Sequence, residues 1–236
     1  MIEAVIVDVD DTLCLTEAAS FDLENDVLAR MGRPPMSRAI HLATWGEPLL
    51  DAMPYRSPGL DLARFAALFP AEHQRYLAEG RLDVIPAENL EALDALAAPG
   101  RTIMLLTSRA EAEVRHLLEP GHALAGRVTG AYHQGNTKFR KPDPRVFDEL
   151  LAETGFRPER CVYVGDSPGD AVAAAGAGLR FIACLESGVR RADEFEPRFV
   201  SAVVATFPEV VAAVDGLEQR GQQQPDTPAE NRAEQR

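Results

Sequence analysis

Three acidic residues directly follow a short apolar run near the start of the chain. The run "AVIV" occupies residues 4–7, and Asp8, Asp10 and Asp11 come next, interrupted only by Val9. Like charges at such short range repel, so the arrangement costs stability unless a cation, a proton or a reaction uses it. Asp8 and Asp10 are therefore the first candidates for chemistry, whereas Asp11 is better explained as a turn former or helix cap.

Further polar groups stand where other predicted strands end or predicted helices begin. Thr107 and Ser108 follow the apolar run "TIMLL", and Lys141 precedes a predicted helix. The segment "VGDSPGD" supplies two more carboxylates, Asp166 and Asp170. Ligands of parallel α/β sheets bind outside the carboxyl ends of the strands, so we expect these groups to converge on one edge. Oxygen ligands suit a hard cation such as Mg²⁺, and a cation beside a lysine suits a phosphoryl group.

The elements that must position these residues alternate between strand and helix. Short apolar runs predict strands at residues 2–7, 102–106, 128–133, 161–166 and 180–185. The runs between them predict helices at 89–96, 110–119, 143–155 and 168–178, the third with Asp143 as its N-cap. Such alternation is typical of a parallel sheet with helices on both faces. The predicted fold class is α/β, with a Rossmann-like, doubly wound parallel sheet as its core.

One long segment breaks this alternation. Between Cys14 and Asp83 only helical patterns occur, at 16–32, 37–53 and 60–80, with interruptions predicted near Gly46 and at Pro70. We therefore predict an α/β core made of residues 1–13 and 84–217, with an all-helical cap inserted at 14–83. The last residues, 218–236, are almost without apolar side chains, which predicts a disordered tail.

Composition narrows the classes of function. The chain has 236 residues and a formal net charge of −13, which argues against broad binding to nucleic acid or to anionic membranes. No run is long enough to span a bilayer, and the short apolar start lacks the basic lead of a signal peptide. Three scattered cysteines form neither a metal-binding spacing nor a disulfide framework, which favours a cytoplasmic protein. We expect a monomer or homodimer.

Four motifs together resemble the haloacid dehalogenase (HAD) superfamily. They are "DVDDT", "LLTS", "KPDP" and "VGDSPGD", in that order, and they frame nearly the whole core up to about Cys184. The helical insertion resembles the type 1 cap of that superfamily, as in phosphoglycolate phosphatases and beta-phosphoglucomutases. Any one motif would be weak evidence, whereas four in sequence are strong. The resemblance implies a phosphoric monoester hydrolase that acts on a small phosphorylated metabolite.

The resemblance also implies a role for each motif residue. Asp8 would attack phosphorus and become an aspartyl phosphate, while Asp10 would protonate the leaving oxygen and then deprotonate water. Thr107, with Ser108 beside it, would bind the phosphoryl oxygens, and Lys141 would neutralise charge on both nucleophile and phosphate. Mg²⁺ would be held by Asp8, Asp166 and the backbone carbonyl of Asp10. Asp170 would orient these ligands or bind the metal through a water molecule.

The predicted cap says less about function. Trp45 and Glu47 interrupt a helical pattern in "ATWGEPLL", where some relatives place a substrate-contacting loop. The alternative is a helix break packed by a core tryptophan, which we prefer. Arg109 could contact substrate or simply begin its helix, and the sequence does not choose between these.

Other reactions remain to be weighed. A phosphomutase would use the same four motifs and pass its phosphoryl group to a second sugar. True haloacid dehalogenation needs neither a metal nor a second Asp two residues on, so Asp10, Asp166 and Asp170 argue against it. A non-catalytic, receiver-like phosphate-binding module would place its acceptor Asp on a later strand and lack the insertion. We therefore expect a Mg²⁺-dependent phosphatase.

Overall fold

The computed structural model describes residues 1–223 and contains one six-stranded parallel sheet. Its strands are β1 (Ala4–Val7), β2 (Thr102–Leu106), β3 (Gly130–Tyr132), β4 (Cys161–Gly165), β5 (Arg180–Cys184) and β6 (Ala202–Val204). They pair in the order β3-β2-β1-β4-β5-β6, so the chain builds outward from β1 in both directions. The predicted fold class is confirmed, and β6 is an addition that the sequence analysis did not predict. The switch point of this order lies between β1 and β4.

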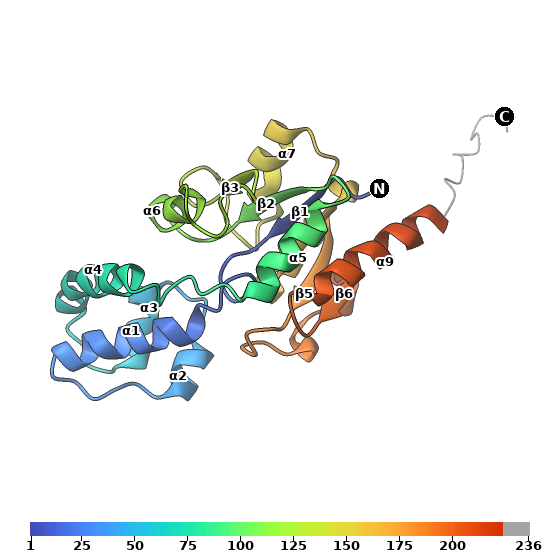
Figure 1. Cartoon of the computed structure of the whole chain (residues 1–236). Coiled ribbons are helices and arrows are strands. Elements are labelled where there is room, and N and C mark those ends of the chain that lie inside the picture. The colour runs from blue at the N-terminus through green and yellow to red at the C-terminus, as the bar shows by residue number, and fades with distance from the viewer. Residues whose placement is uncertain (224–236) are drawn as a thin grey trace.

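Both faces of the sheet are buried, which explains why β1 is apolar without alternation. Val5 and Val7 belong to the core on one face, with side chains of α5 (Ala87–Ala97) and α9 (Glu209–Gln223). Ala4 and Ile6 belong to the core on the other face, with α7 (Asp148–Thr154) and α8 (Pro168–Gly176). Helices α5 and α9 lie side by side over their face (Figure 1). Successive strand residues point to opposite faces, so each face receives alternate side chains of β1.

Shorter helical segments complete the core. Helix α6 (Glu111–Val114) is a single turn followed by a 3₁₀ turn at Arg115–Leu118, so the helix predicted at 110–119 is mostly not α-helical. Asp143 caps the 3₁₀ turn Pro144–Phe147 that leads into α7, and its Oδ1 accepts a hydrogen bond from Arg145 N. The remaining 3₁₀ turns are Pro158–Arg160, Ala192–Glu194 and Pro197–Phe199.

The four helices between β1 and α5 gather at one end of the molecule (Figure 1). They are α1 (Glu17–Arg30), α2 (Arg38–Ala43), α3 (Leu49–Arg56) and α4 (Leu62–Ala78), and all lie within the predicted cap range. They enclose an apolar cluster of their own, which includes Val27, Met53 and Phe65. Two chain segments, residues 8–16 and 79–86, connect them to the sheet, and Leu15 N donates to Val84 O at 3.0 Å between these segments.

The interruption predicted at Pro70 was wrong, because α4 continues through it. A proline inside a helix removes one backbone hydrogen bond and usually kinks or ends the helix. Here tertiary contacts on both sides of Pro70 offset that cost. Phe65 and Tyr76 are fully buried, and the Tyr76 hydroxyl donates to Asp26 of α1 at 2.8 Å.

The N-terminus of helix α1 is capped by a side chain from outside the helix. Thr16 occupies the N-cap position, but its side chain makes no capping hydrogen bond. Asp11 does so instead: its Oδ1 accepts from Thr16 N and Glu17 N, both at 3.1 Å. Asp11 lies in a left-handed backbone conformation (φ 57°), which Asp tolerates better than most residues. The interpretation of Asp11 as a turn former and helix cap is confirmed.

The predicted boundary of the tail was too early. Helix α9 runs to Gln223, so residues 218–223 are helical rather than disordered. Glu218 accepts a hydrogen bond from Arg101 Nη2 at 2.8 Å, which ties this part of α9 to the start of β2. Residues 224–236 of the predicted tail lie outside the described residues. Within the part that the structure describes, none of the helices has the length and apolar character needed to cross a bilayer.

Candidate active site

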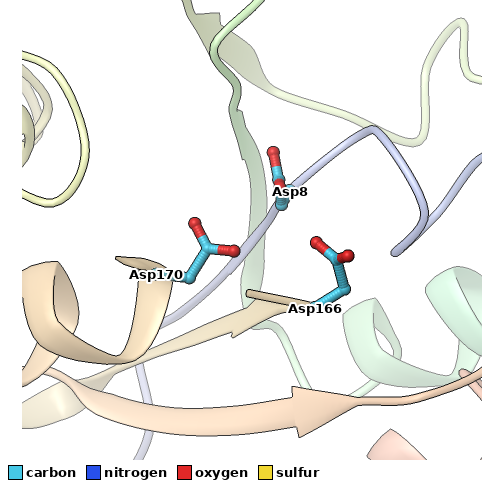
Figure 2. A group of neighbouring side chains, drawn as sticks. All are labelled: Asp8, Asp166 and Asp170. Carbon is cyan, nitrogen blue, oxygen red and sulfur yellow. The ribbon is translucent and has the colours of Figure 1, made fainter. Parts of the chain in front are cut away.

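Three carboxylates meet at the switch point of the sheet. Asp8 follows β1, Asp166 follows β4, and Asp170 lies in the first turn of α8. One oxygen atom from each lies within 4.8 Å of the others, and all three side chains are buried. Figure 2 shows the three carboxylates around a common space. This convergence follows from the pairing of β1 with β4, which aligns their carboxyl ends.

Lys141 provides positive charge beside two of these carboxylates. Its Nζ lies 3.0 Å from Asp8 Oδ2 and 2.7 Å from Asp170 Oδ1. It also donates to the hydroxyl of Tyr163 at 3.1 Å. Although burial would lower the pKa of Lys141, the charges of Asp170 and Asp8 hold it well above its usual value. The site therefore favours the charged ammonium form, and burial distinguishes Lys141 from the exposed Lys138 nearby.

One lysine does not neutralise three carboxylates. Burial raises the pKa of Asp8 to about 7, with further contributions from Asp170 and Asp10, while Lys141 opposes the rise. Burial, together with Asp170 and Asp8, raises the pKa of Asp166 well above its usual value. These shifts mean that the ionised cluster lacks positive charge. A divalent cation bound by oxygen ligands would supply it, so the residues present fit Mg²⁺.

The hydrogen bonds of Asp170 suit an orienting role better than direct ligation. Its Oδ1 pairs with Lys141 and accepts from the Tyr163 hydroxyl at 3.2 Å. Its Oδ2 accepts from Ser167 Oγ at 2.7 Å and from Ser167 N at 3.1 Å. Each oxygen of Asp170 thus has two protein partners, whereas each oxygen of Asp8 has one, so Asp8 keeps more capacity to bind a cation. The sequence did not indicate a role for Tyr163, because it lies within the apolar run of β4 and reads as a core residue.

Asp10 lies outside this cluster of three. Its carboxylate binds Arg109, whose Nη2 donates to Oδ1 at 2.7 Å and whose Nε reaches both oxygens at 3.1 Å. Burial would raise the pKa of Asp10, but the charge and hydrogen bonds of Arg109 lower it. Asp10 remains one-third exposed, so it can still reach a bound molecule. Arg109 therefore contacts Asp10. The sequence had suggested only contact with substrate or the start of a helix for this arginine.

The two residues that follow β2 differ in environment. Thr107 is buried, and its Oγ1 accepts from Arg109 N at 3.2 Å, which leaves the hydroxyl proton free to donate elsewhere. Pairing of β2 with β1 aligns this end of β2 with Asp8. Ser108 is exposed, and its carbonyl accepts a hydrogen bond from the side chain of Gln134.

The predicted cap residues do not join the acidic cluster. Trp45 is partly buried, and its ring packs against His41 with centroids 5.2 Å apart. Its Nε1 donates to Asp11 Oδ2 at 2.6 Å, and its carbonyl accepts from Arg190 Nη2 at 3.2 Å. Trp45 therefore connects the helical segment to residues 8–16 and to the loop after β5. Glu47 is exposed on the same loop.

Comparison with known proteins agrees with this architecture. The family model described as haloacid dehalogenase-like hydrolase matches residues 5–184. A phosphoglycolate phosphatase from Rhodospirillum rubrum is 31% identical over 229 residues, covering 92% of this chain and 91% of that protein. CbbY from Rhodobacter sphaeroides, solved in complex with phosphate, superposes with a TM-score of 0.72 at 24% identity, covering 91% of this chain and 100% of that one.

A third relative extends the structural likeness. A beta-phosphoglucomutase from Clostridium difficile superposes with a TM-score of 0.68 at 14% identity, covering 95% of this chain and 100% of that one. At such identities the solved structures support the fold alone. The predicted resemblance and the predicted enzyme class, a phosphoric monoester hydrolase, are confirmed by the family match and the relatives together. The chain belongs to the haloacid dehalogenase-like hydrolase family.

Proposed function

We propose that the protein is a Mg²⁺-dependent phosphatase that hydrolyses a small phosphorylated metabolite through phospho-Asp8. The observation that carries this proposal is the contact between Lys141 and Asp8, 3.0 Å, inside a buried cluster of carboxylates. A nucleophilic carboxylate must be ionised, and the lysine favours that form. The same ammonium group then stabilises negative charge that develops on the phosphoryl oxygens.

The proposed reaction has two displacements at phosphorus. In the first, an oxygen of Asp8 attacks phosphorus, the ester bond to the leaving oxygen breaks, and Asp10 gives that oxygen a proton. Asp10 must be protonated for this step, although Arg109 lowers its pKa. In the second, Asp10 takes a proton from water, which attacks the acyl phosphate and releases inorganic phosphate and free Asp8. Thr107 donates its hydroxyl proton to a phosphoryl oxygen. General acid–base groups of this kind contribute roughly 10²–10⁴-fold to rate.

The proposed metal site uses Asp8, Asp166 and the backbone carbonyl of Asp10, with Asp170 orienting the shell. Mg²⁺, when bound, would offset the charge on these carboxylates and on the substrate phosphate. The raised pKa values of Asp8 and Asp166 support this assignment, because they show how poorly the cluster tolerates its own charge. Asp10 contributes through its backbone, since its side chain is engaged by Arg109.

The proposed substrate is small because the helical segment contacts the core close to the site. Trp45 donates a hydrogen bond to Asp11, which is next to Asp10 in the chain, so the loop at residues 44–48 lies near Asp10. Trp45 and Glu47 remain candidates for contact with the part of the substrate that carries no phosphate. The name of the Rhodospirillum rubrum relative makes 2-phosphoglycolate the first compound to test.

The direct test measures phosphate release from a panel of small phosphorylated metabolites and one aryl phosphate. We expect release in Mg²⁺ and none in excess chelator, with restored release when Mg²⁺ is added back. The best compound in the panel then indicates the substrate class. Isomerisation of a sugar phosphate without phosphate release would favour the mutase alternative, and no reaction with any compound would contradict the proposal.

Gly165 provides a structural test of the same site. A Cβ added at this position would lie 2.7 Å from Asp170 Oδ2 and 2.9 Å from Asp170 Cβ, closer than real contacts allow. Gly165→Ala should therefore displace Asp170 and with it Lys141, which costs at least about tenfold in kcat by analogy with small misplacements at active sites. Phosphate release and thermal unfolding measure the two consequences. Gly216→Ala, at a helical position where the nearest atom is 3.5 Å away, should keep full activity; loss of activity in both variants would contradict the argument.

A further inference from the structure

Arg109 joins the site to one of the two segments that connect the helices α1–α4 with the sheet. Its guanidinium group donates hydrogen bonds to both carboxylate oxygens of Asp10, and the Arg109 side chain is only 11% exposed. On the other side Nη1 donates to the carboxylate of Asp83. A planar guanidinium bound to two carboxylates in this way has little freedom, so its position defines theirs.

Asp83 is itself held in an unusual backbone conformation. It lies in the second connecting segment, residues 79–86, with a left-handed φ of 51°. Its other carboxylate oxygen contacts His116 Nε2 at 2.6 Å, so Arg109 and His116 of the core together anchor this point of the segment. Such backbone strain persists only where the surroundings maintain it. Asp83 is therefore a fixed contact between the connecting segment and the catalytic edge of the sheet.

We propose that Arg109 is a positioning residue that orients Asp10 for proton transfer and, through Asp83, links that orientation to the helical segment. A displacement of residues 79–86 moves Asp83 and acts on the same guanidinium that binds Asp10. This inference rests on the proposed function, because Asp10 needs an orientation only if it transfers protons. It assigns Arg109 no contact with substrate.

The test separates the two chemical steps with an aryl phosphate. A good leaving group needs little protonation, so formation of phospho-Asp8 should depend weakly on Asp10, whereas its hydrolysis depends on Asp10 as base. In Arg109→Met we expect the phenol to be released in the first turnover at the wild-type rate. Steady-state kcat should fall by about 10–100-fold, part of what acid–base catalysis supplies.

Further variants keep the test informative if Arg109→Met folds poorly. Arg109→Lys retains the charge but not the two-sided geometry, so we expect a smaller fall in kcat, about threefold to tenfold. Asp83→Asn leaves Asp10 and Arg109 intact and should lower kcat in the same steady-state phase. The double variant should be less impaired than the two single effects multiplied, because the residues act through one contact.

Arg101→Met is the matched control for loss of a buried arginine. The side chain of Arg101 is 4% exposed and pairs with Asp215 and Glu218. Arg101 directly precedes β2, so it lies at the end of the strand opposite to Thr107. We expect it to lower the thermal midpoint without changing kcat.

Two results would overturn the inference. One is a first turnover in Arg109→Met that slows as much as kcat does, since Arg109 would then act on the nucleophile or the metal. The other is an unchanged kcat in Arg109→Met or in Asp83→Asn. Wild-type protein without Mg²⁺-dependent phosphate release would instead contradict the proposed function itself.

Discussion

Replacing Asp8 with Asn is expected to lower turnover by at least about 10³-fold, the scale seen when a nucleophile is removed from a covalent mechanism. The amide has nearly the same shape, so it can keep the hydrogen bond that Asp8 Oδ1 accepts from Val9 N at 2.9 Å. It lacks the nucleophilic oxygen anion. Lys141 retains its contact with Asp170 at 2.7 Å, so the lysine stays buried in place.

The same variant should keep its stability or gain some. Burial raises the pKa of Asp8 to about 7, so the charged form of this carboxylate is unfavourable in the folded protein without metal. A neutral amide removes that cost and reduces the repulsion on Asp166 and Asp170. We therefore expect a thermal midpoint in chelator equal to or above that of the wild type, with a smaller increase on adding Mg²⁺.

Two measurements check the role of Asp8. Phosphate release gives the loss of turnover, and quenching with labelled substrate should trap a hydroxylamine-sensitive acyl phosphate in wild type but not in Asp8→Asn. Asp94→Asn is the control, because Asp94 is exposed and pairs with Arg127 at the surface. An Asp8→Asn protein that retained several per cent of wild-type turnover would show that another group attacks phosphorus.

Much of the site was predictable because it depends on where strands end. Asp8 and Asp166 follow β1 and β4, which are neighbours in the sheet, so a correct strand assignment already brings them together. The position of Lys141 before a predicted helix made it a candidate, but that position does not indicate whether Lys138 or Lys141 is the buried lysine, and the family resemblance supplied the choice. The position of Lys141 in the fold depends on the loop before the 3₁₀ turn Pro144–Phe147, which has no simple sequence signal.

The contacts of Arg109 could not be predicted for a different reason. Its partner Asp83 lies at the end of the helical insertion. The path of residues 79–86 is what brings Asp83 close to Arg109. That path depends on how α1–α4 pack together, which local patterns do not encode. The predictions of a helix break at Pro70 and of a disordered tail from Glu218 were wrong for a similar reason. Packing of α4 on α1 and the ion pair of Arg101 with Glu218 outweigh the local preference of each segment.

Replacing Lys141 with Met should reduce kcat by about 10²–10³-fold, the scale of losing one preorganised electrostatic contact to a developing oxyanion. The methionine keeps much of the apolar stem but leaves Asp8 and Asp170 without the ammonium group, which lies within 3.0 Å of both. Breaking a buried ion pair by removing one partner costs about 3–5 kcal/mol. Uptake of a proton by Asp8 would reduce this cost, since burial already raises the pKa of that carboxyl to about 7.

The effect of Mg²⁺ distinguishes this electrostatic role from simple packing. If Lys141 offsets carboxylate charge, Mg²⁺ should raise the thermal midpoint of Lys141→Met by more than it raises that of the wild type, because the metal replaces part of the missing positive charge. Turnover should stay low even in saturating Mg²⁺, since the phosphate still lacks its lysine. Lys138→Met is the matched control: Lys138 is 83% exposed and lies 3.7 Å from Glu149, so neither quantity should change. An equal shift of the thermal midpoint by Mg²⁺ in Lys141→Met and wild type would mean that the buried lysine does not compensate the charge of Asp8 and Asp170.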